Sequence, residues 1–222
     1  MARRLPTLCA LVLTSAMLAP SAQAADWYLG GSIGRSQIDV STSEIQEGFL
    51  IDDDFVATDI SLDDTDVGWK AYVGYRLLPV LSLEGVYVDL GEATFNSSIV
   101  DAPPPFDSIT PFTIRARAAA DGPQLAVLAH LPLTERLEVL GRVGLFRWEA
   151  EFRERIPDTG ATRVDRSEDD IDLVYGLGVQ YGLYGGFGAR LEWERMEGVG
   201  EGIGGRGGRD VDFFSIGLTL GF

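Results

Sequence analysis

A two-residue alternation of apolar with polar or small side chains runs through most of this chain. Segment 66–77 shows the alternation most clearly, because one set of positions is apolar and the other contains glycine, lysine and arginine. The apolar set is Val67, Trp69, Ala71, Val73, Tyr75 and Leu77, and the other set is Gly68, Lys70, Tyr72, Gly74 and Arg76. Successive side chains of a β-strand point to opposite faces, so this period predicts strands with two different faces.

The same alternation recurs often enough to predict eight strands. They span Trp27–Arg35, Asp66–Leu77, Leu81–Asp89, Thr113–Leu131, Leu137–Trp148, Ile171–Tyr181, Gly188–Arg195 and Val211–Phe222. Residues 113–131 fit least well, because Asp121-Gly122-Pro123 interrupts the run. Arg115 and Arg117 would fall on the apolar face of this strand unless a β-bulge resets the register.

The charged positions indicate which face of the strands points outward. Lys70, Glu84, Arg142, Arg190 and Glu192 lie in the polar sets, and aromatic residues lie near the strand ends of the apolar sets. Charges inside a soluble core would be costly. An apolar outer face, a polar interior and aromatic residues at both rims are typical of a transmembrane β-barrel. The sequence therefore predicts an all-β, eight-stranded, antiparallel, up-and-down transmembrane barrel.

The predicted connections support this topology. Leu77–Val80, Pro132–Arg136 and Gly182–Phe187 are short, about 39–65, 91–112 and 154–170 are long, and Gly198–Arg209 is intermediate. Outer-membrane barrels have short periplasmic turns and longer outer loops, and an even strand number puts both termini in the periplasm.

Two other folds compete with the barrel. Residues 173–189 carry no charge and could form a transmembrane helix, but glycine is frequent there and the two-residue alternation continues through them. A soluble β-sandwich or lipocalin-like barrel is the stronger alternative. It would have fewer aromatic residues at its strand ends.

The N-terminal segment has the features of a secretory signal peptide. Arg3 and Arg4 precede a short apolar stretch, Leu8–Leu18, and Ala22-Gln23-Ala24 forms an A-x-A cleavage site. We expect residues 1–24 to be cleaved and residues 25–222 to form one barrel domain. The single cysteine, Cys9, lies in the signal peptide, so no disulfide or cysteine-based metal site is expected. A formal charge of −16 excludes a nucleic-acid partner.

The expected mature chain resembles the OmpA-type small outer-membrane barrels of Gram-negative bacteria. The resemblance depends on the order and spacing of short pieces: Trp27-Tyr28-Leu29-Gly30, Gly74-Tyr75, Gly122-Pro123-Gln124-Leu125, Pro132, Arg142-Val143-Gly144, Gly178-Val179-Gln180-Tyr181 and Arg190-Leu191-Glu192-Trp193. It implies location in the outer membrane, contact with outer-membrane lipid, and assembly by the outer-membrane machinery. Because the chain ends on the eighth strand, the peptidoglycan-binding role of longer members is not expected.

The resemblance also implies an interior ion pair between Glu84 and Arg190. The chain departs from the family pattern at Leu128 and Gln180, where an interior lysine and an acid are replaced. The interior of an eight-stranded barrel is just filled by side chains, so we expect a polar network inside it. Its members would be Lys70, Glu84, Arg142, Gln180, Arg190 and Glu192. A narrow ion-conducting path is the alternative.

Three further groups of residues are candidates for contacts. The alternating residues Phe214, Ile216, Leu218, Leu220 and Phe222 resemble the C-terminal signal that the assembly machinery reads. Six arginines in the predicted third and fourth loops are candidates for contact with lipopolysaccharide phosphates: Arg153, Arg155, Arg163, Arg166, Arg206 and Arg209. Segment 39–66 contains ten acids and no lysine or arginine, but it lacks the spacing of a calcium loop. We expect a solvated loop, with a divalent-cation site as the alternative.

Catalysis receives little support from the sequence. The only histidine, His130, lies two residues before Pro132 at the predicted periplasmic end. Gly200–Gly205 matches a dinucleotide-binding glycine pattern, but no helix follows it. We expect a monomer without cofactor or metal that has a structural or surface-interaction role. The alternatives are a narrow channel and an enzyme acting on lipid A or peptides.

Overall fold

The computed structural model describes residues 27–38, 57–63, 65–99, 112–156, 161–200 and 209–222. The strands in these ranges are β1 (Trp27–Ile38), β2 (Ala57–Asp63), β3 (Thr65–Leu78), β4 (Leu81–Ile99), β5 (Phe112–Pro132), β6 (Leu137–Ile156), β7 (Ala161–Gly182), β8 (Phe187–Val199) and β9 (Arg209–Gly221). In this part of the chain, no helix is long and apolar enough to cross a bilayer. The segment 173–189 instead forms the end of β7 and the start of β8.

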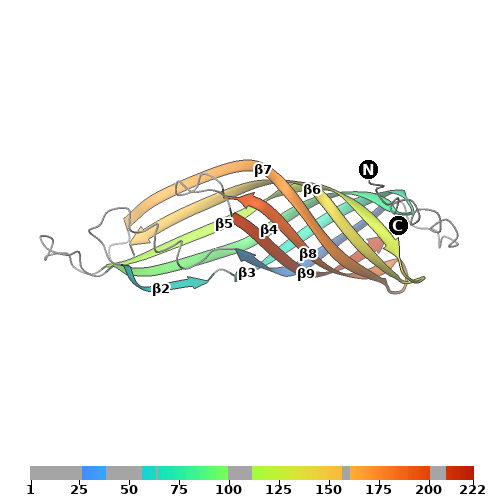
Figure 1. Ribbon diagram of the computed structural model, residues 1–222, viewed down its shortest axis with the longest axis horizontal. Coiled ribbons are helices and arrows are strands. Elements are labelled where there is room, and N and C mark those ends of the chain that lie inside the picture. The colour runs from blue at the N-terminus through green and yellow to red at the C-terminus, as the bar shows by residue number, and fades with distance from the viewer. Residues whose placement is uncertain (1–26, 39–56, 64, 100–111, 157–160, 201–208) are drawn as a thin grey trace, which may run out of the picture.

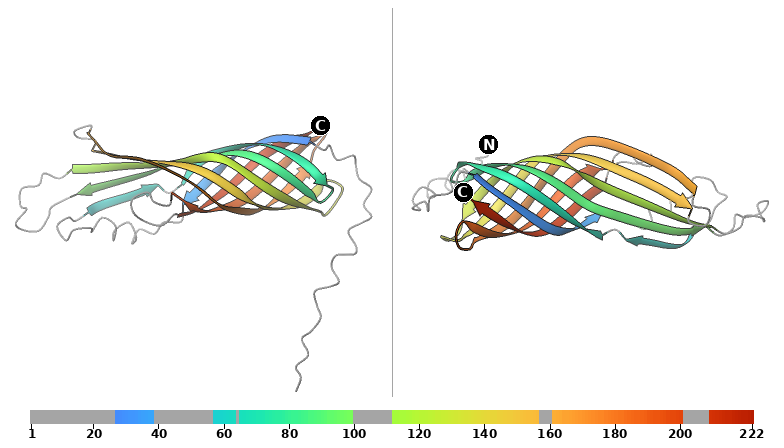
Figure 2. Two further views of the ribbon diagram at one scale, coloured as in Figure 1. Left: turned by 90° about the horizontal axis from the view of Figure 1, so that it is seen from above. Right: turned by 180° about the vertical axis from the view of Figure 1, so that it is seen from behind.

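Eight of these strands close into an antiparallel barrel, which confirms the predicted fold (Figures 1 and 2). Neighbours follow chain order from β3 to β9, β1 pairs with both β3 and β9, and the β4–β5 pairing completes the ring. Thus Ile33 of β1 lies opposite Trp69 on one side and Ile216 on the other. Closure pairs the backbone groups of every barrel strand, which is what a lipid environment requires.

The two ends of the barrel differ. The turns joining β3 to β4, β5 to β6 and β7 to β8 are short and lie at the end where the C-terminus emerges (Figure 1). At this end the amide of Phe222 donates a hydrogen bond to the carbonyl of Trp27 at 2.9 Å. At the opposite end the strands continue beyond the barrel and β2 pairs with the far part of β4, where Ser61 lies opposite Asn96.

The predicted third outer loop is largely β-sheet and the second is β-sheet in its first part, so the predicted outer ends of three strands were wrong. β4 continues to Ile99, β6 continues to Ile156 and β7 starts at Ala161, whereas β5 starts at Phe112, one residue before its predicted start. These outer parts of β4, β5, β6 and β7, together with β2, form what we call the outer sheet (Figure 2). Water reaches both faces of an extended hairpin, so its strands need no apolar face and give no two-residue hydrophobic signal. In the first predicted loop, β2 occupies 57–63, and the rest lies mainly outside the described residues.

The register of β5 is continuous. Arg115 and Arg117 are exposed on the same face as Leu125, without a bulge in β5. The register shift falls in the neighbouring strand β4, between Asp89 and Glu92, where Gly91 has a φ of 80°. This left-handed conformation favours glycine.

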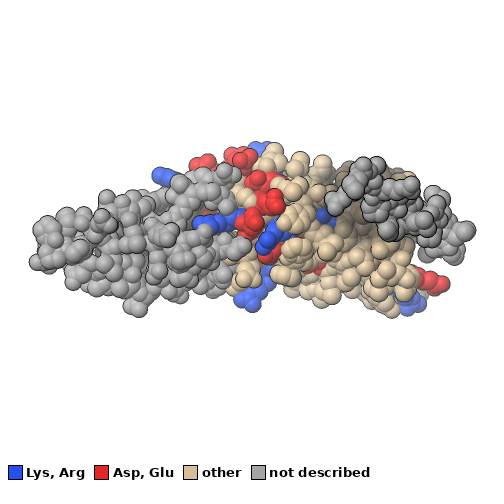
Figure 3. All heavy atoms as spheres, in the orientation of Figure 1, with Lys and Arg blue, Asp and Glu red and all other residues tan. Residues whose placement is uncertain are grey.

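An apolar belt surrounds the barrel. Outward side chains remain exposed in the isolated chain, for example Leu125 at 57%, Val143 at 52% and Ile216 at 58%. Aromatic pairs mark its two rims, with Trp27 and Tyr75 at one end (ring centroids 4.9 Å apart) and Tyr175 and Trp193 at the other (6.2 Å). On the face drawn in Figure 3, charged side chains gather near the middle, and most of the surface between them and the turn end is uncharged.

Candidate functional site: the charged lumen and the outer arginines

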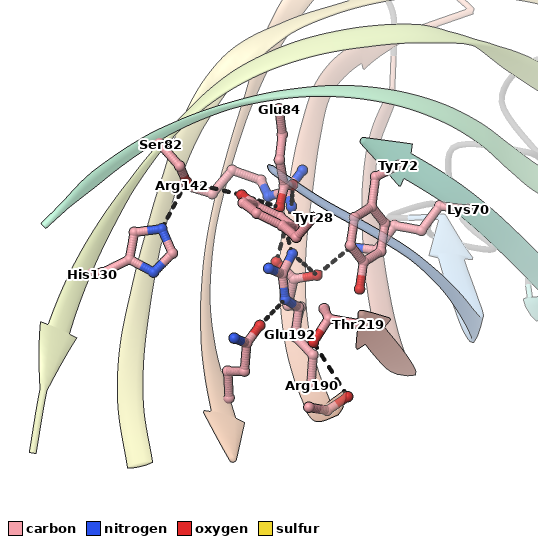
Figure 4. Close-up of polar contacts among 12 residues, drawn as sticks. Tyr28, Lys70, Tyr72, Ser82, Glu84, His130, Arg142, Arg190, Glu192 and Thr219 are labelled. Atoms are coloured by element: carbon pink, nitrogen blue, oxygen red, sulfur yellow. Dashed lines mark hydrogen bonds and ion pairs between the residues drawn. The ribbon is translucent and has the colours of Figure 1, made fainter. Parts of the chain in front are cut away.

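Three strands bring cations into the lumen, and two strands bring acids. The cations are Lys70 of β3, Arg142 of β6 and Arg190 of β8, and the acids are Glu84 of β4 and Glu192 and Glu194 of β8. All six positions have inward parity in their strands, which is why residues far apart in sequence meet. Figure 4 shows five of them, without Glu194. Each of the six residues is at least nine-tenths buried.

Glu84 lies at the centre of this network. Its Oε1 accepts hydrogen bonds from Arg190 Nη1 at 2.6 Å and from the Tyr28 hydroxyl at 2.9 Å, and its Oε2 pairs with Arg142 (Figure 4). A carboxylate buried in this way is stable only because cations and donors surround both oxygens.

The two glutamates of β8 connect the remaining cations. Lys70 Nζ lies 2.7 Å from Glu192 Oε2 and also pairs with Glu194. Arg142 bridges both acids, with Nη2 3.1 Å from Glu192 and Nε 3.0 Å from Glu194. The six side chains therefore form one continuous set of ion pairs across the barrel.

Two aromatic rings pack against Arg190, one of the two arginines of this network. The Arg190 guanidinium carbon lies 4.7 Å from the ring centre of Tyr72 and 5.6 Å from that of Tyr28. These distances fit cation–π contacts, which keep a desolvated guanidinium in a favourable environment.

A layer of apolar side chains fills the lumen on the outer side of the charges. It includes Val88, Phe146, Trp148, Met196 and Phe213, each with no measurable exposure. Val88, Phe146, Trp148 and Met196 continue the inward parity of the strands that carry the charges, and Phe213 is buried on β9. The charged layer is thus closed toward the outer end by packed hydrophobic groups.

A second polar cluster lies at the turn end of the lumen. His130 Nε2 lies 2.7 Å from the Ser82 hydroxyl, and its Nδ1 lies 3.2 Å from Arg76 and 3.4 Å from Glu138. Gln180 joins the two clusters, because it donates to Glu138 and accepts from Arg190 Nε, both at 2.9 Å.

This cluster contains a serine, a histidine and a carboxylate within contact distance, but it is not arranged for catalysis. Ser82 and His130 are buried, and the Ser82 hydroxyl also lies 2.9 Å from that of Tyr28. In a catalytic arrangement the Nδ1 atom of His130 would contact only the carboxylate of Glu138, but here Arg76 also contacts this atom. A nucleophile needs access to its substrate as well as a base.

The six residues predicted to line the lumen all point into it. Five are buried and Gln180 is half-buried. Leu128 is also fully buried in the lumen. Sequence reasoning missed Glu194, Tyr28 and Tyr72 as members of the network. Their parity was available as a signal, because Glu194 follows Arg190 and Glu192 at two-residue intervals.

The predicted outer arginines do not form one group. Arg153 and Arg155 are exposed on β6, Arg166 is exposed on β7, and Arg209 is half-buried at the start of β9. The Arg163 side chain and Arg206 lie outside the described residues. Arg153 pairs with Glu151 at 2.8 Å and with Asp165 at 3.5 Å.

The structure describes only some of the remaining predicted features, which are the C-terminal assembly signal, the signal peptide and the acidic segment. Phe214, Ile216, Leu218 and Phe222 are exposed on the outer surface of β9 and the residue after it, and Leu220 is half-buried. The expected signal peptide, 1–24, and most of the acidic segment 39–66 lie outside the described residues. Within the described residues, no cluster of three or more His, Cys, Asp or Glu side chains could hold a metal ion.

A closed barrel with an apolar belt, aromatic rims and a charged, filled interior defines a small transmembrane β-barrel. The profile of the OmpA-like transmembrane domain matches residues 22–222. The chain belongs to this family and lies in the bacterial outer membrane.

Individual relatives are distant in sequence. Outer membrane protein A of Klebsiella pneumoniae is 27% identical over 199 residues, covering 88% of this chain and 51% of that protein. The Salmonella typhi protein is 25% identical over 222 residues, covering 97% and 55%. The chain thus spans about half the length of these curated relatives. The crystal structure of Ail, the attachment invasion locus protein of Yersinia pestis, matches with a TM-score of 0.47 and 14% identity, covering 89% of this chain and 99% of that one.

Proposed function

We propose that the protein is a non-conducting, non-enzymatic outer-membrane barrel that serves envelope structure and presents its outer sheet to surface partners. The observation that carries this proposal is the filled lumen. An ion would have to separate Lys70, Arg142 and Glu192 and then pass Phe146 and Trp148, all of which are buried and packed. Breaking a buried pair of charges costs several kcal/mol, which opposes steady conduction.

The proposed partners follow from the surface. The apolar belt would contact outer-membrane lipid, and the exposed row that ends at Phe222 would be read by the assembly machinery. The outer arginines would contact lipopolysaccharide phosphates, for which guanidinium geometry is suited. We propose a monomer, because the barrel closes within one chain.

Single-channel recording in planar bilayers tests the main proposal. We expect no discrete conductance steps from the purified protein under conditions in which a general porin conducts. Steps that appear with the wild-type chain and change in size in Glu192→Gln would overturn the proposal. Such a result would favour the narrow-channel alternative, because Glu192 faces only the lumen.

A further inference from the structure

Four arginines from two neighbouring strands meet on the outward face of the outer sheet. In the β5–β6 register, Arg117 lies opposite Arg153 and Arg115 lies opposite Arg155. Together with Glu92, Ala119 and Glu151 they line a hollow of about 370 Å³. The unbroken register between β5 and β6 puts all four arginines on one face.

The charge of this hollow is only partly compensated. Arg117 lies 3.3 Å from Glu92, and Arg153 lies 2.8 Å from Glu151 and 3.5 Å from Asp165. Arg115 Nε donates to the neutral amide oxygen of Asn96 at 2.9 Å. Within the described ranges, no carboxylate pairs with either Arg115 or Arg155.

Arginine opposite arginine on neighbouring strands is unfavourable for the sheet when no ligand is bound. Like charges directly opposite each other on adjacent strands destabilise the pairing, and here two arginine pairs follow one another. The whole chain has only 18 lysines and arginines against 34 acids, so the concentration of four arginines at one place opposes the average composition. A bound anion would offset the repulsion.

The position of the hollow excludes phospholipid headgroups as the source of the anion. Arg117 and Arg153 lie eight residues beyond Leu125 and Leu145, which are lipid-exposed and opposite each other. At about 3.4 Å per residue and a tilt of about 40°, the arginines lie about 20 Å beyond these belt residues. The headgroup region on each side of a bilayer is only about 5–8 Å thick, so phospholipid phosphates do not reach the hollow.

We propose that Arg115, Arg117, Arg153 and Arg155 form a binding site for a compact, multiply charged group of phosphates or sulfates carried on a sugar or similar small scaffold. Planar guanidinium groups bind such oxyanions through paired hydrogen bonds. The inference rests on the surface-interaction role proposed above and names the ligand chemistry of that surface.

Binding of inositol hexakisphosphate to the protein in phosphatidylcholine nanodiscs tests the site. We expect saturable binding by calorimetry that weakens with salt. The double variant Arg117→Ala/Arg153→Ala should lose at least about tenfold in affinity, because two of the four charge-assisted contacts are removed. The double variant Arg117→Lys/Arg153→Lys should recover only part of the loss, since lysine keeps the charge but not the fork.

A matched control separates this site from net charge. Arg35→Ala/Arg147→Ala also removes two exposed arginines, one on β1 and one on β6, but neither lines the hollow. The affinity of this variant for inositol hexakisphosphate should be within about twofold of wild type, because only the long-range electrostatic potential changes. No saturable binding by wild type, or equal loss in both double variants that still show heat-modifiable migration, would refute the site. Channel activity would refute the proposed function without affecting this result.

Competition identifies the source of the anion. The polysaccharide part of lipopolysaccharide, released from its lipid, should be compared before and after removal of its phosphates. Displacement of the probe only by the phosphorylated form supports the site and assigns the anion to the cell's own envelope. Failure of both forms to displace a probe that still depends on Arg117 and Arg153 supports the site and assigns it to a soluble anion.

Discussion

At the scale of single residues, Glu84 determines whether the lumen charges are balanced. It is fully buried and contacts Arg142, Arg190 and the Tyr28 hydroxyl. A buried ion pair adds little net stability compared with a hydrophobic core, but the loss of one partner leaves an unpaired charge. Glu84 therefore matters because it completes the network, and the number of ion pairs matters less.

We predict that Glu84→Gln lowers the free energy of unfolding by about 3–5 kcal/mol, because two buried arginines lose their shared carboxylate. Asp169→Asn is the matched control. It removes the partner of Arg147, 3.2 Å away and about two-thirds exposed, and should cost less than about 1 kcal/mol. Urea titration in lipid vesicles measures both. Equal midpoints for the two variants would show that Glu84 is not required for charge balance.

At the scale of strands, tyrosine and glycine face each other across β1 and β3. Tyr28 lies opposite Gly74, and Gly30 lies opposite Tyr72. A Cβ added at Gly74 would lie 2.1 Å from Cζ of Tyr28, so the ring occupies the space that a side chain would need. Each glycine thus lets an aromatic ring lie flat against the opposite strand, which brings both rings against Arg190.

Gly74→Ala should therefore destabilise the barrel by about 1–3 kcal/mol through overpacking. The Tyr28 ring cannot move freely, because its hydroxyl contacts Ser82 and Glu84. Gly85 is the control, since it lies opposite Val73, next to Gly74, and a Cβ there meets nothing within 4 Å. Gly85→Ala should leave the urea midpoint unchanged or raise it. A lower midpoint for Gly85→Ala than for Gly74→Ala would contradict this packing explanation.

At the scale of the whole molecule, the barrel and the outer sheet depend on different interactions. The barrel strands combine an apolar belt with a filled lumen, whereas the outer sheet has exposed charges such as Arg147, Asp169 and Arg153. Beyond Val174, toward its outer end at Ala161, β7 pairs with β6 but no longer with β8. The sheet therefore opens between β7 and β8. The outer sheet therefore presents surface to water and adds little to closure of the barrel.

Shortening the outer hairpin should leave the barrel folded. Ala150 and Glu168 are register partners, so Glu151–Ser167 can be replaced by an Asn-Gly turn, which suits a two-residue hairpin. We expect heat-modifiable gel migration to persist while anion binding is lost with Arg153 and Arg155. A contrasting change, Ile216→Arg in the belt, should cost about 2–4 kcal/mol and lower the folded fraction. Loss of the heat shift in the hairpin variant alone would show that the outer sheet is needed for closure.

The sequence by itself determined the barrel and the direction of its side chains. A side-chain period of two is a local property, so it placed Lys70, Glu84, Arg142 and Arg190 on inward faces before any contact was known. The same parity included Glu194, although its role in the network was missed. Sequence did not give the outer ends of β4, β6 and β7, because strands with water on both faces need no alternating pattern.

Only the tertiary structure decided which inward residues meet and at what height. The stagger between neighbouring strands sets these contacts, and it depends on pairing across the whole ring rather than on any one strand. Closure brought Glu84 to Arg142 and Arg190, and it put His130 beside Ser82 at the turn end of the lumen. It likewise put Arg115 opposite Arg155, a cluster that no spacing along the chain reveals because β5 and β6 supply its members separately.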